Sequence, residues 1–234
     1  MQEEIERALG VVFAVPSVSV TVAGRTDTGV HARGQVASYE HEAVDPRRLN
    51  ALLPPDVAVL DCNPAPEGFD ARRDATSRAY TYRILARRAR SALLAGRVLH
   101  WPHVIEMSLL DACAAALVGD HDFTAFTPTE TEHVRFERQV LTAFWRRSPA
   151  EHGVLEFWIE ADAFMRHMNR VLVGTMLEVA GGRRTQASFA QLLEGRARSD
   201  AGPTAPAHGL YLAGVGYGGE RVLQTPNGLR GART

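Results

Sequence analysis

Gly24-Arg25-Thr26-Asp27-Thr28-Gly29-Val30-His31-Ala32 joins two apolar segments, residues 18–23 and 35–39, which have the β-branched character of strands. Glycines at both ends and a polar interior predict a loop at a sheet edge. Asp27 then has two interpretations. It either bonds its own backbone in a tight turn, or it faces a cleft as an ionised carboxylate. Arg25 favours ionisation, and a fixed, ionised carboxylate is a nucleophile.

The chain on either side of this loop alternates short strands and helices. We expect helices at 3–9, 46–53, 108–117, 164–179 and 188–193, and further strands at 57–60, 79–85, 141–146, 154–161 and 210–217. Hairpins mixed with helices indicate an α+β fold, with mainly antiparallel sheets covered by helices. We expect two similar subdomains, 1–70 and 71–219, with a basic active-site cleft between them. A flexible tail is expected at 220–234.

Composition sets limits on the class of protein. Apolar residues make up 45% and charged residues 23%, as in an ordinary globular domain. Pro16 interrupts the longest apolar run, so we expect no membrane span. The acidic N-terminus lacks the pattern of a signal peptide. Cys62 and Cys113 lack metal-ligand spacing, so we expect free thiols in a reducing cytoplasm and no metal site.

Positive charge is concentrated in one segment although the net charge is −1. All 26 basic residues are arginine, the side chain best suited to bidentate phosphate contacts. Residues 70–97 hold eight arginines against two aspartates. The segment is therefore either a solvated basic face or a surface that binds a phosphate backbone. The arginines of this segment that we select as RNA-binding candidates are Arg78, Arg83, Arg87 and Arg88.

The loop resembles the active-site signature of the bacterial tRNA pseudouridine synthase A family, and Gly34-Gln35-Val36 continues the match. Four further stretches resemble the family in the same order. They are Phe69 to Tyr82, Asp122 to Phe126, Phe164 to Gly174 and Ala205 to Leu212. The resemblance therefore covers nearly the whole chain. It implies an isomerase that converts uridines of the tRNA anticodon arm, at positions 38, 39 and 40, to pseudouridine.

The resemblance also implies roles for particular residues. Asp27 is the expected nucleophile, Arg170 its ion-pair partner, Tyr80 the active-site tyrosine, and Arg25 a contact to RNA and to the flipped-out nucleotide. Arg166, expected one turn from Arg170, is a further candidate for phosphate contact. The family implies a homodimer that binds one tRNA across both subunits, and neither metal nor small-molecule cofactor. By residue type alone, a tyrosine on a strand such as Tyr80 is a core aromatic, and the adjacent Arg78 and Arg83 favour a role in RNA contact. Arg170 by residue type alone is either a surface residue or a buried one with a partner.

Relatives in the family begin with a strand carrying Tyr-Asp-Gly, followed by a stretch that ends in Gly-Trp-Gln. The printed sequence begins after that strand, at the helix matched by residues 2–9. One alternative function is therefore a catalytically impaired RNA-binding remnant of the family. A carboxylate-dependent glycosidase is a third interpretation, but it needs two acids that flank one bond. His31 is either an acid–base group or a hydrogen-bonded structural residue, and His167 is expected to pack.

Overall fold

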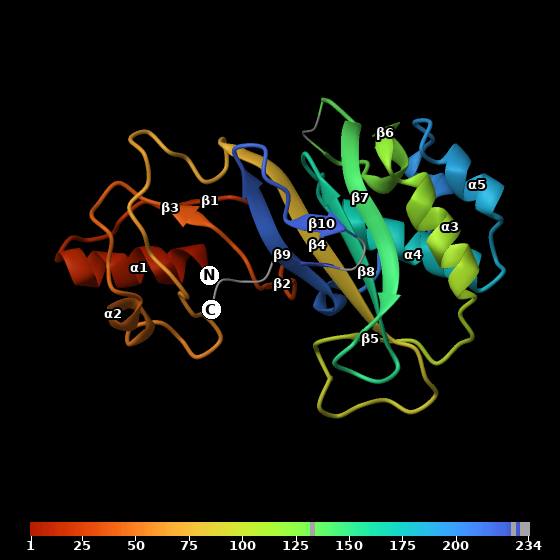
Figure 1. Ribbon diagram of the computed structural model, residues 1–234, viewed down its shortest axis with the longest axis horizontal. Coiled ribbons are helices and arrows are strands. Elements are labelled where there is room, and N and C mark those ends of the chain that lie inside the picture. The colour runs from red at the N-terminus through yellow and green to blue at the C-terminus, as the bar shows by residue number, and fades with distance from the viewer. Residues whose placement is uncertain (132–133, 226–227, 230–234) are drawn as a thin grey trace. The chain divides into compact units, whose positions relative to one another are not determined.

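The computed structural model describes residues 1–131, 134–225 and 228–229 (Figure 1). These residues form two compact units. Unit 1 comprises Met1–Arg25 and Gln35–Ala75, and unit 2 comprises Thr26–Gly34 and Thr76–Thr234. The loop with Asp27 thus belongs to unit 2, although the segments on both sides of it belong to unit 1. We expected a boundary at residue 70, and the chain passes from unit 1 to unit 2 after Ala75.

Unit 1 packs two helices against a small antiparallel sheet. Its elements are α1 (Gln2–Phe13), β1 (Thr21–Val22), β3 (Ala37–Ser38) and α2 (Pro46–Asn50). The predicted start of α2 is confirmed, because the Asp45 side chain accepts a hydrogen bond from the Arg47 amide at 2.8 Å. Leu9, Val20 and Leu49 are buried in the core of this unit.

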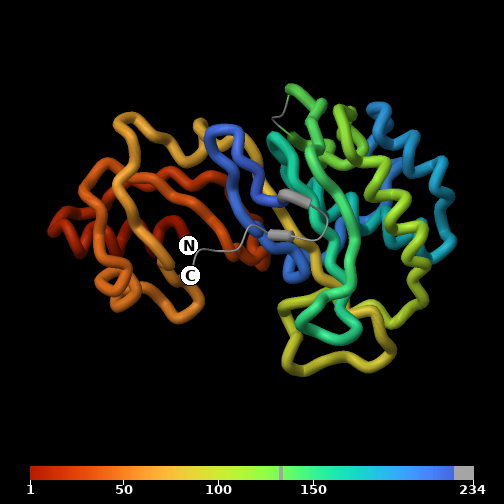
Figure 2. Tube along the Cα trace, viewed as in Figure 1, coloured from red at the N-terminus to blue at the C-terminus, as the bar shows by residue number. Residues whose placement is uncertain are grey.

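Unit 2 is built on a mixed sheet, seven-stranded within the described residues. Its strands are β2 (His31–Ala32), β4 (Ala75–Leu85), β5 (Leu99–His100), β6 (Gly119–Asp122), β7 (Glu137–Arg147), β8 (Val154–Ala161) and β9 (Leu210–Tyr217). The order is β2-β9-β4-β8-β7-β6, and β5 pairs in parallel with β4. Figure 2 shows the late segment β9, in blue, beside the much earlier β4. The predicted α+β class is confirmed.

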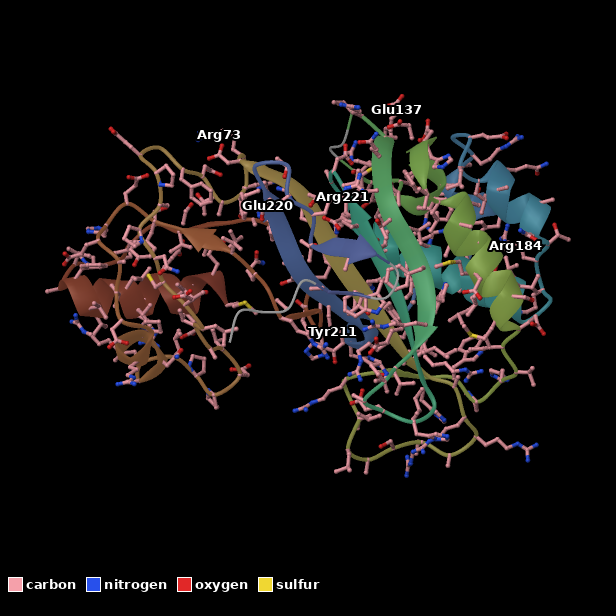
Figure 3. The ribbon with its side chains drawn as sticks, viewed as in Figure 1. Arg73, Glu137, Arg184, Tyr211, Glu220 and Arg221 are labelled. Carbon is pink, nitrogen blue, oxygen red and sulfur yellow. The ribbon has the colours of Figure 1, made fainter. Side chains whose placement is uncertain are left out.

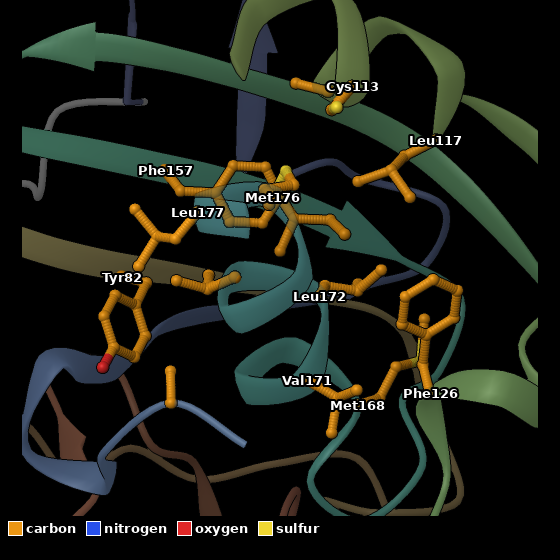
Figure 4. Close-up of a cluster of buried hydrophobic side chains, with 14 of the residues drawn as sticks. Tyr82, Cys113, Leu117, Phe126, Phe157, Met168, Val171, Leu172, Met176 and Leu177 are labelled. Atoms are coloured by element: carbon orange, nitrogen blue, oxygen red, sulfur yellow. The ribbon is translucent and has the colours of Figure 1, made fainter. Parts of the chain in front are cut away.

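Three helices, α3 (Met107–Ala116), α4 (Met168–Ala180) and α5 (Gln186–Gln191), cover one face of this sheet (Figure 1). Short 3-10 turns complete the unit at η1 (Thr124–Phe126), η2 (Arg198–Asp200) and η3 (Ala207–Gly209). Leu172 and Met176 of α4 are fully buried against aromatic side chains such as Phe157 and Phe126 (Figure 4). Each such side chain contributes about 1.5–3 kcal/mol by burial, so α4 is held firmly.

The tail expected to be flexible from residue 220 forms a strand at β10 (Leu223–Thr225), which pairs with β11 (Gly228–Leu229). The side chain of Leu223 is buried, and its amide donates to the Glu160 carboxylate at 2.7 Å. Glu160 is itself buried and also accepts from the Val222 amide and from Ser77 Oγ. The rest of the predicted tail, 226–227 and 230–234, lies outside the described residues.

Two local predictions were wrong, and one strand was not predicted. Residues 57–60 do not form a strand. The Asn50 side chain instead holds Val59 through two hydrogen bonds, and Leu60 is exposed. The helix predicted from residue 164 begins at Met168. Strand β6 was not expected, because its sequence Gly-Asp-His-Asp has no apolar alternation.

Candidate active site around Asp27

The Asp27 loop is fixed to the end of the large sheet by its backbone. The Asp27 carbonyl accepts from the Val30 amide at 3.0 Å, and Gly29 has φ 84°, a value that favours glycine. Strand β2 then pairs in parallel with β9. The turn is thus closed by the main chain, and the Asp27 carboxylate is left to contact side chains from another element.

Arg170 is the first of these contacts. Its Nη1 lies 3.1 Å from Asp27 Oδ2, and its Nε donates to the Ala205 carbonyl at 2.7 Å. The Arg170 carbonyl in turn accepts from the Ala205 amide at 3.0 Å. The expected ion pair is therefore present. One guanidinium joins the loop with Asp27 to the segment before β9.

Gly174, one turn further along α4, explains how the segment around Ala205 comes so close. A Cβ at Gly174 would collide with the Pro203 carbonyl oxygen, so only glycine permits this approach of the two backbones. The approach places the Ala205 carbonyl within reach of Arg170. The small residue at 174 therefore supports the site from a distance.

His167 was missed as a site residue. It is the N-cap of α4, with the left-handed φ of 61°, and its Nε2 lies 3.2 Å from Asp27 Oδ2. Burial lowers the pKa of His167 below its ordinary value. The positive charges of Arg170, Arg166 and Arg198 lower it further, while Asp27 opposes them. The lowered pKa favours the neutral imidazole at neutral pH, and its Nε2 lies beside the carboxylate oxygen.

Tyr80 projects from β4 into the core of unit 2 and is 8% exposed. Its ring meets Phe164 edge to face, with centroids 5.0 Å apart. Burial raises the pKa of Tyr80 to about 12; Arg78 opposes this rise, and the negative charge of Asp27 adds to it. The phenol is therefore neutral at neutral pH.

The arginine candidates do not form one group. Arg83 is 4% exposed and forms ion pairs with Glu151 and Glu156, so it differs from the surface phosphate ligand that we expected. Arg83 lies on the face of β4 opposite to the core residues Tyr80 and Tyr82, and the strand is buried on that face as well. Arg78 is half-buried and donates to the Asp162 carbonyl at 3.1 Å.

The remaining arginine candidates are exposed. Arg87 and Arg88 lie on the connection after β4, together with Arg90 and Arg97. Arg166 lies before the first residue of α4, so the expected one-turn spacing from Arg170 along a helix is wrong. Arg25 is exposed at the last residue of the first segment of unit 1.

The basic connection, residues 86–98, is held at its base by two aromatic side chains. Tyr211 of β9 donates its hydroxyl to the Arg97 carbonyl at 2.6 Å (Figure 3). His31 stacks on Tyr211, and its Nε2 lies 3.0 Å from the Gly96 carbonyl. His31 thus has the contacts of a hydrogen-bonded structural residue, the second of its two interpretations. The arginines of this connection extend from an anchored loop.

Two further features of the described residues concern metal binding and the crossing of a membrane. Among residues 1–131, 134–225 and 228–229, no group of three or more His, Cys, Asp or Glu side chains is placed to hold a metal ion. Within the same ranges, no helix has the length and apolar character needed to cross a bilayer. Cys62 and Cys113 are both free thiols.

Comparison with known proteins defines the class. A family model described as tRNA pseudouridine synthase matches residues 113–218, which include α4, Arg170 and β9. The chain is 40% identical over 243 residues to "tRNA pseudouridine synthase A" of Myxococcus xanthus, and the match covers 99% of this chain and 87% of the relative. It is 39% identical over 229 residues to the protein of the same name from Chromobacterium violaceum, with 95% and 86% covered.

The chain therefore belongs to the tRNA pseudouridine synthase A family, and it is an enzyme of the isomerase class. A third relative of that name, from Burkholderia mallei, is 39% identical over 236 residues, with 94% of this chain and 82% of the relative covered. The family predicted from the sequence motifs is thus confirmed.

Proposed function

We propose that this protein converts uridines at positions 38, 39 and 40 of the tRNA anticodon arm to pseudouridine, with Asp27 as the nucleophile. The observation that carries the proposal is the carboxylate of Asp27, fixed by Arg170 and His167 and still 33% exposed. A group that is both held and accessible fits a nucleophile better than it fits a buried structural ion pair.

The conversion of uridine to pseudouridine requires few further groups from the protein. The bond from C1′ to N1 of uracil breaks, the base turns, and C1′ bonds to C5. N1 gains a proton and C5 loses one, so nothing is oxidised or reduced. Arg170 and His167 hold the carboxylate in one orientation, and fixed groups of this kind lower the entropic cost of reaction. We expect no metal or small-molecule cofactor to take part.

Reaching the glycosidic carbon requires the uridine to leave its stack, which costs a few kcal/mol. An aromatic face returns about 1–3 kcal/mol per stacked base. We propose that Tyr80 supplies the aromatic contact and that Arg25 contacts the flipped nucleotide. Arg78 and Arg166 are proposed to contact the RNA backbone. We further propose that the enzyme acts in the cytoplasm as a homodimer.

The function is tested by release of tritium from tRNA labelled at C5 of uridine, followed by mapping of pseudouridine along the product. The protein is first dialysed exhaustively against a chelator. We expect turnover with modification confined to the three positions of the anticodon arm. Binding of tRNA without any release of tritium would instead support the RNA-binding remnant. Turnover that returns only with added zinc would contradict a cofactor-free reaction.

The anchored basic connection at 86–98 is proposed to bind phosphates. Changing Arg87, Arg88 and Arg90 together to Gln should weaken tRNA binding and flatten the plot of log affinity against log salt. The slope should change by about 0.9 for each duplex phosphate that the variant no longer binds. Filter binding over a series of salt concentrations measures both quantities.

The matched control removes the same charge from exposed arginines elsewhere in unit 2, with Arg135, Arg183 and Arg196 changed to Gln. This variant should keep the original slope. If both triple variants change the slope equally, residues 86–98 act only through net charge and form no particular binding surface.

A further inference from the structure

Asp27 receives both of its side-chain contacts on the same oxygen. Within the described part of the chain, Arg170 Nη1 and His167 Nε2 lie 3.1 Å and 3.2 Å from Oδ2. Arg170 donates a hydrogen bond to that oxygen, and the ring nitrogen of His167 lies beside the same oxygen. Oδ1 is left as the oxygen with free lone pairs, and it is therefore the better nucleophile of the two.

The backbone at His167 is arranged to serve this contact. A residue other than glycine at φ 61° costs about 1 kcal/mol or more, and such strain persists where the surroundings enforce it. The His167 carbonyl accepts from the amides of Arg170 and Val171, each at 3.0 Å, so the main chain enters α4 directly after it. The side chain consequently turns away from the helix and toward Asp27.

The start of α4 adds a further reason for a negative group to lie there. The first amides of a helix carry a partial positive charge, which favours an anion near them. α4 has 13 residues, and His167 and Arg170 flank its first turn. The Asp27 carboxylate therefore contacts two side chains that lie at the positive end of this helix.

We propose that His167 is a positioning residue, which donates its Nε2–H to Asp27 Oδ2 and leaves Oδ1 as the attacking oxygen. The inference rests on the proposed function, in which Asp27 is the nucleophile. His167 stays neutral in this role and carries its proton on Nε2 throughout. No proton is transferred, because the imidazole acts only as a donor.

The test compares His167→Leu with His167→Gln in the complete protein. Leu removes the donor, whereas the Gln amide places an N–H near the position of Nε2 and cannot titrate. Both replacements carry a similar cost at the left-handed φ, so the backbone strain is matched. The measured quantities are the single-turnover rate of tritium release, the dissociation constant for tRNA and the midpoint of thermal unfolding.

We expect His167→Leu to lower the single-turnover rate roughly 10- to 100-fold, as for removal of a hydrogen bond to a charged group. Its tRNA affinity should stay within about twofold of the original, because the contact is to Asp27 rather than to the phosphate backbone. His167→Gln should restore most of the rate. His121→Leu is the matched control, because His121 lies on the edge strand β6 and its ring contacts Phe123.

Two results would overturn the proposal. One is a His167→Leu rate within about twofold of the original. The other is equal loss of rate in the Leu and Gln variants while both remain folded, because a donor at that position would then not suffice. Asp27→Asn, measured in parallel, separates the two hypotheses. If Asp27→Asn retains turnover, the assignment of Asp27 as the nucleophile fails. If Asp27→Asn is inactive and His167→Leu is fully active, only the positioning role of His167 is refuted.

Discussion

Asp27→Asn is expected to abolish pseudouridine formation and to leave tRNA affinity near normal. Asn preserves the size and planarity of the side chain, and its amide oxygen can still accept from Arg170. It removes the negative charge and the nucleophilic oxygen, so we expect the rate to fall by roughly 10³-fold or more. Single-turnover release of tritium from C5-labelled tRNA measures the chemical step, and filter binding measures affinity.

The control for this prediction is Asp111→Asn, an exposed aspartate on α3. It removes the same charge from unit 2 and should leave the rate unchanged. Turnover by Asp27→Asn within about tenfold of the original would rule out Asp27 as the nucleophile. A large loss of tRNA affinity in the same variant would show instead that the carboxylate organises the binding surface.

The sequence predicted best those elements whose pattern is local. Strands at 154–161 and 210–217 were predicted at their observed bounds, because apolar and β-branched runs define them without reference to the rest of the chain. The strand predicted at 57–60 was wrong for the opposite reason. A side chain from α2 satisfies that backbone, and such a tertiary contact leaves no periodic signal.

The residues of the candidate site were likewise predicted only in part. Asp27 and Arg170 are 143 residues apart, and only the family motif could place them together before the fold was known. His167 lies within that motif but was expected inside a helix, because the apolar spacing extends back to Phe164. A left-handed φ at a residue other than glycine has no reliable sequence signature. The conformation that turns His167 toward Asp27 was therefore not predictable.

Arg83 shows that a cluster of charged residues in the sequence does not predict the exposure of each member. A cluster of arginines in the sequence indicates a basic surface. However, β4 is buried on both faces around Arg83, which is paired there with glutamates from a distant part of the chain. The exposed arginines of residues 86–98 keep the predicted character, because they follow the end of the strand.

The Asp27–Arg170 pair is expected to couple folding to function. Arg170→Met should lower both the free energy of unfolding and turnover, because it leaves the Asp27 carboxylate without its guanidinium and the Ala205 carbonyl without its donor. The two side chains are 16% and 33% exposed, Arg170 being the more buried. The cost should therefore lie between that of a surface pair and that of a fully buried pair, at about 2 kcal/mol.

Arg170→Lys should also be impaired, although the charge remains. The planar guanidinium holds Ala205 with Nε and Asp27 with Nη1 at the same time, whereas one ammonium cannot occupy both positions. We expect Lys to recover part of the stability and little of the turnover. Full recovery by Lys would show that only the charge matters.

A double-mutant cycle isolates the pair itself. Arg170→Met combined with Asp27→Leu should be more stable than the sum of the single changes allows, with a coupling energy of about 1–2 kcal/mol, and should remain inactive. The hydrogen bond from Arg170 to Ala205 cancels in the cycle, because it is absent from both variants that carry Arg170→Met. The contact from His167 to Asp27 cancels likewise, because it is absent from both variants that carry Asp27→Leu.

Urea denaturation above the ordinary pKa of histidine, where His167 is neutral throughout, supplies the four unfolding free energies of this cycle. The pH matters because a protonated imidazole would compensate for the missing guanidinium and mask the coupling between Asp27 and Arg170. Additivity within about 0.5 kcal/mol would refute an energetic coupling between Asp27 and Arg170.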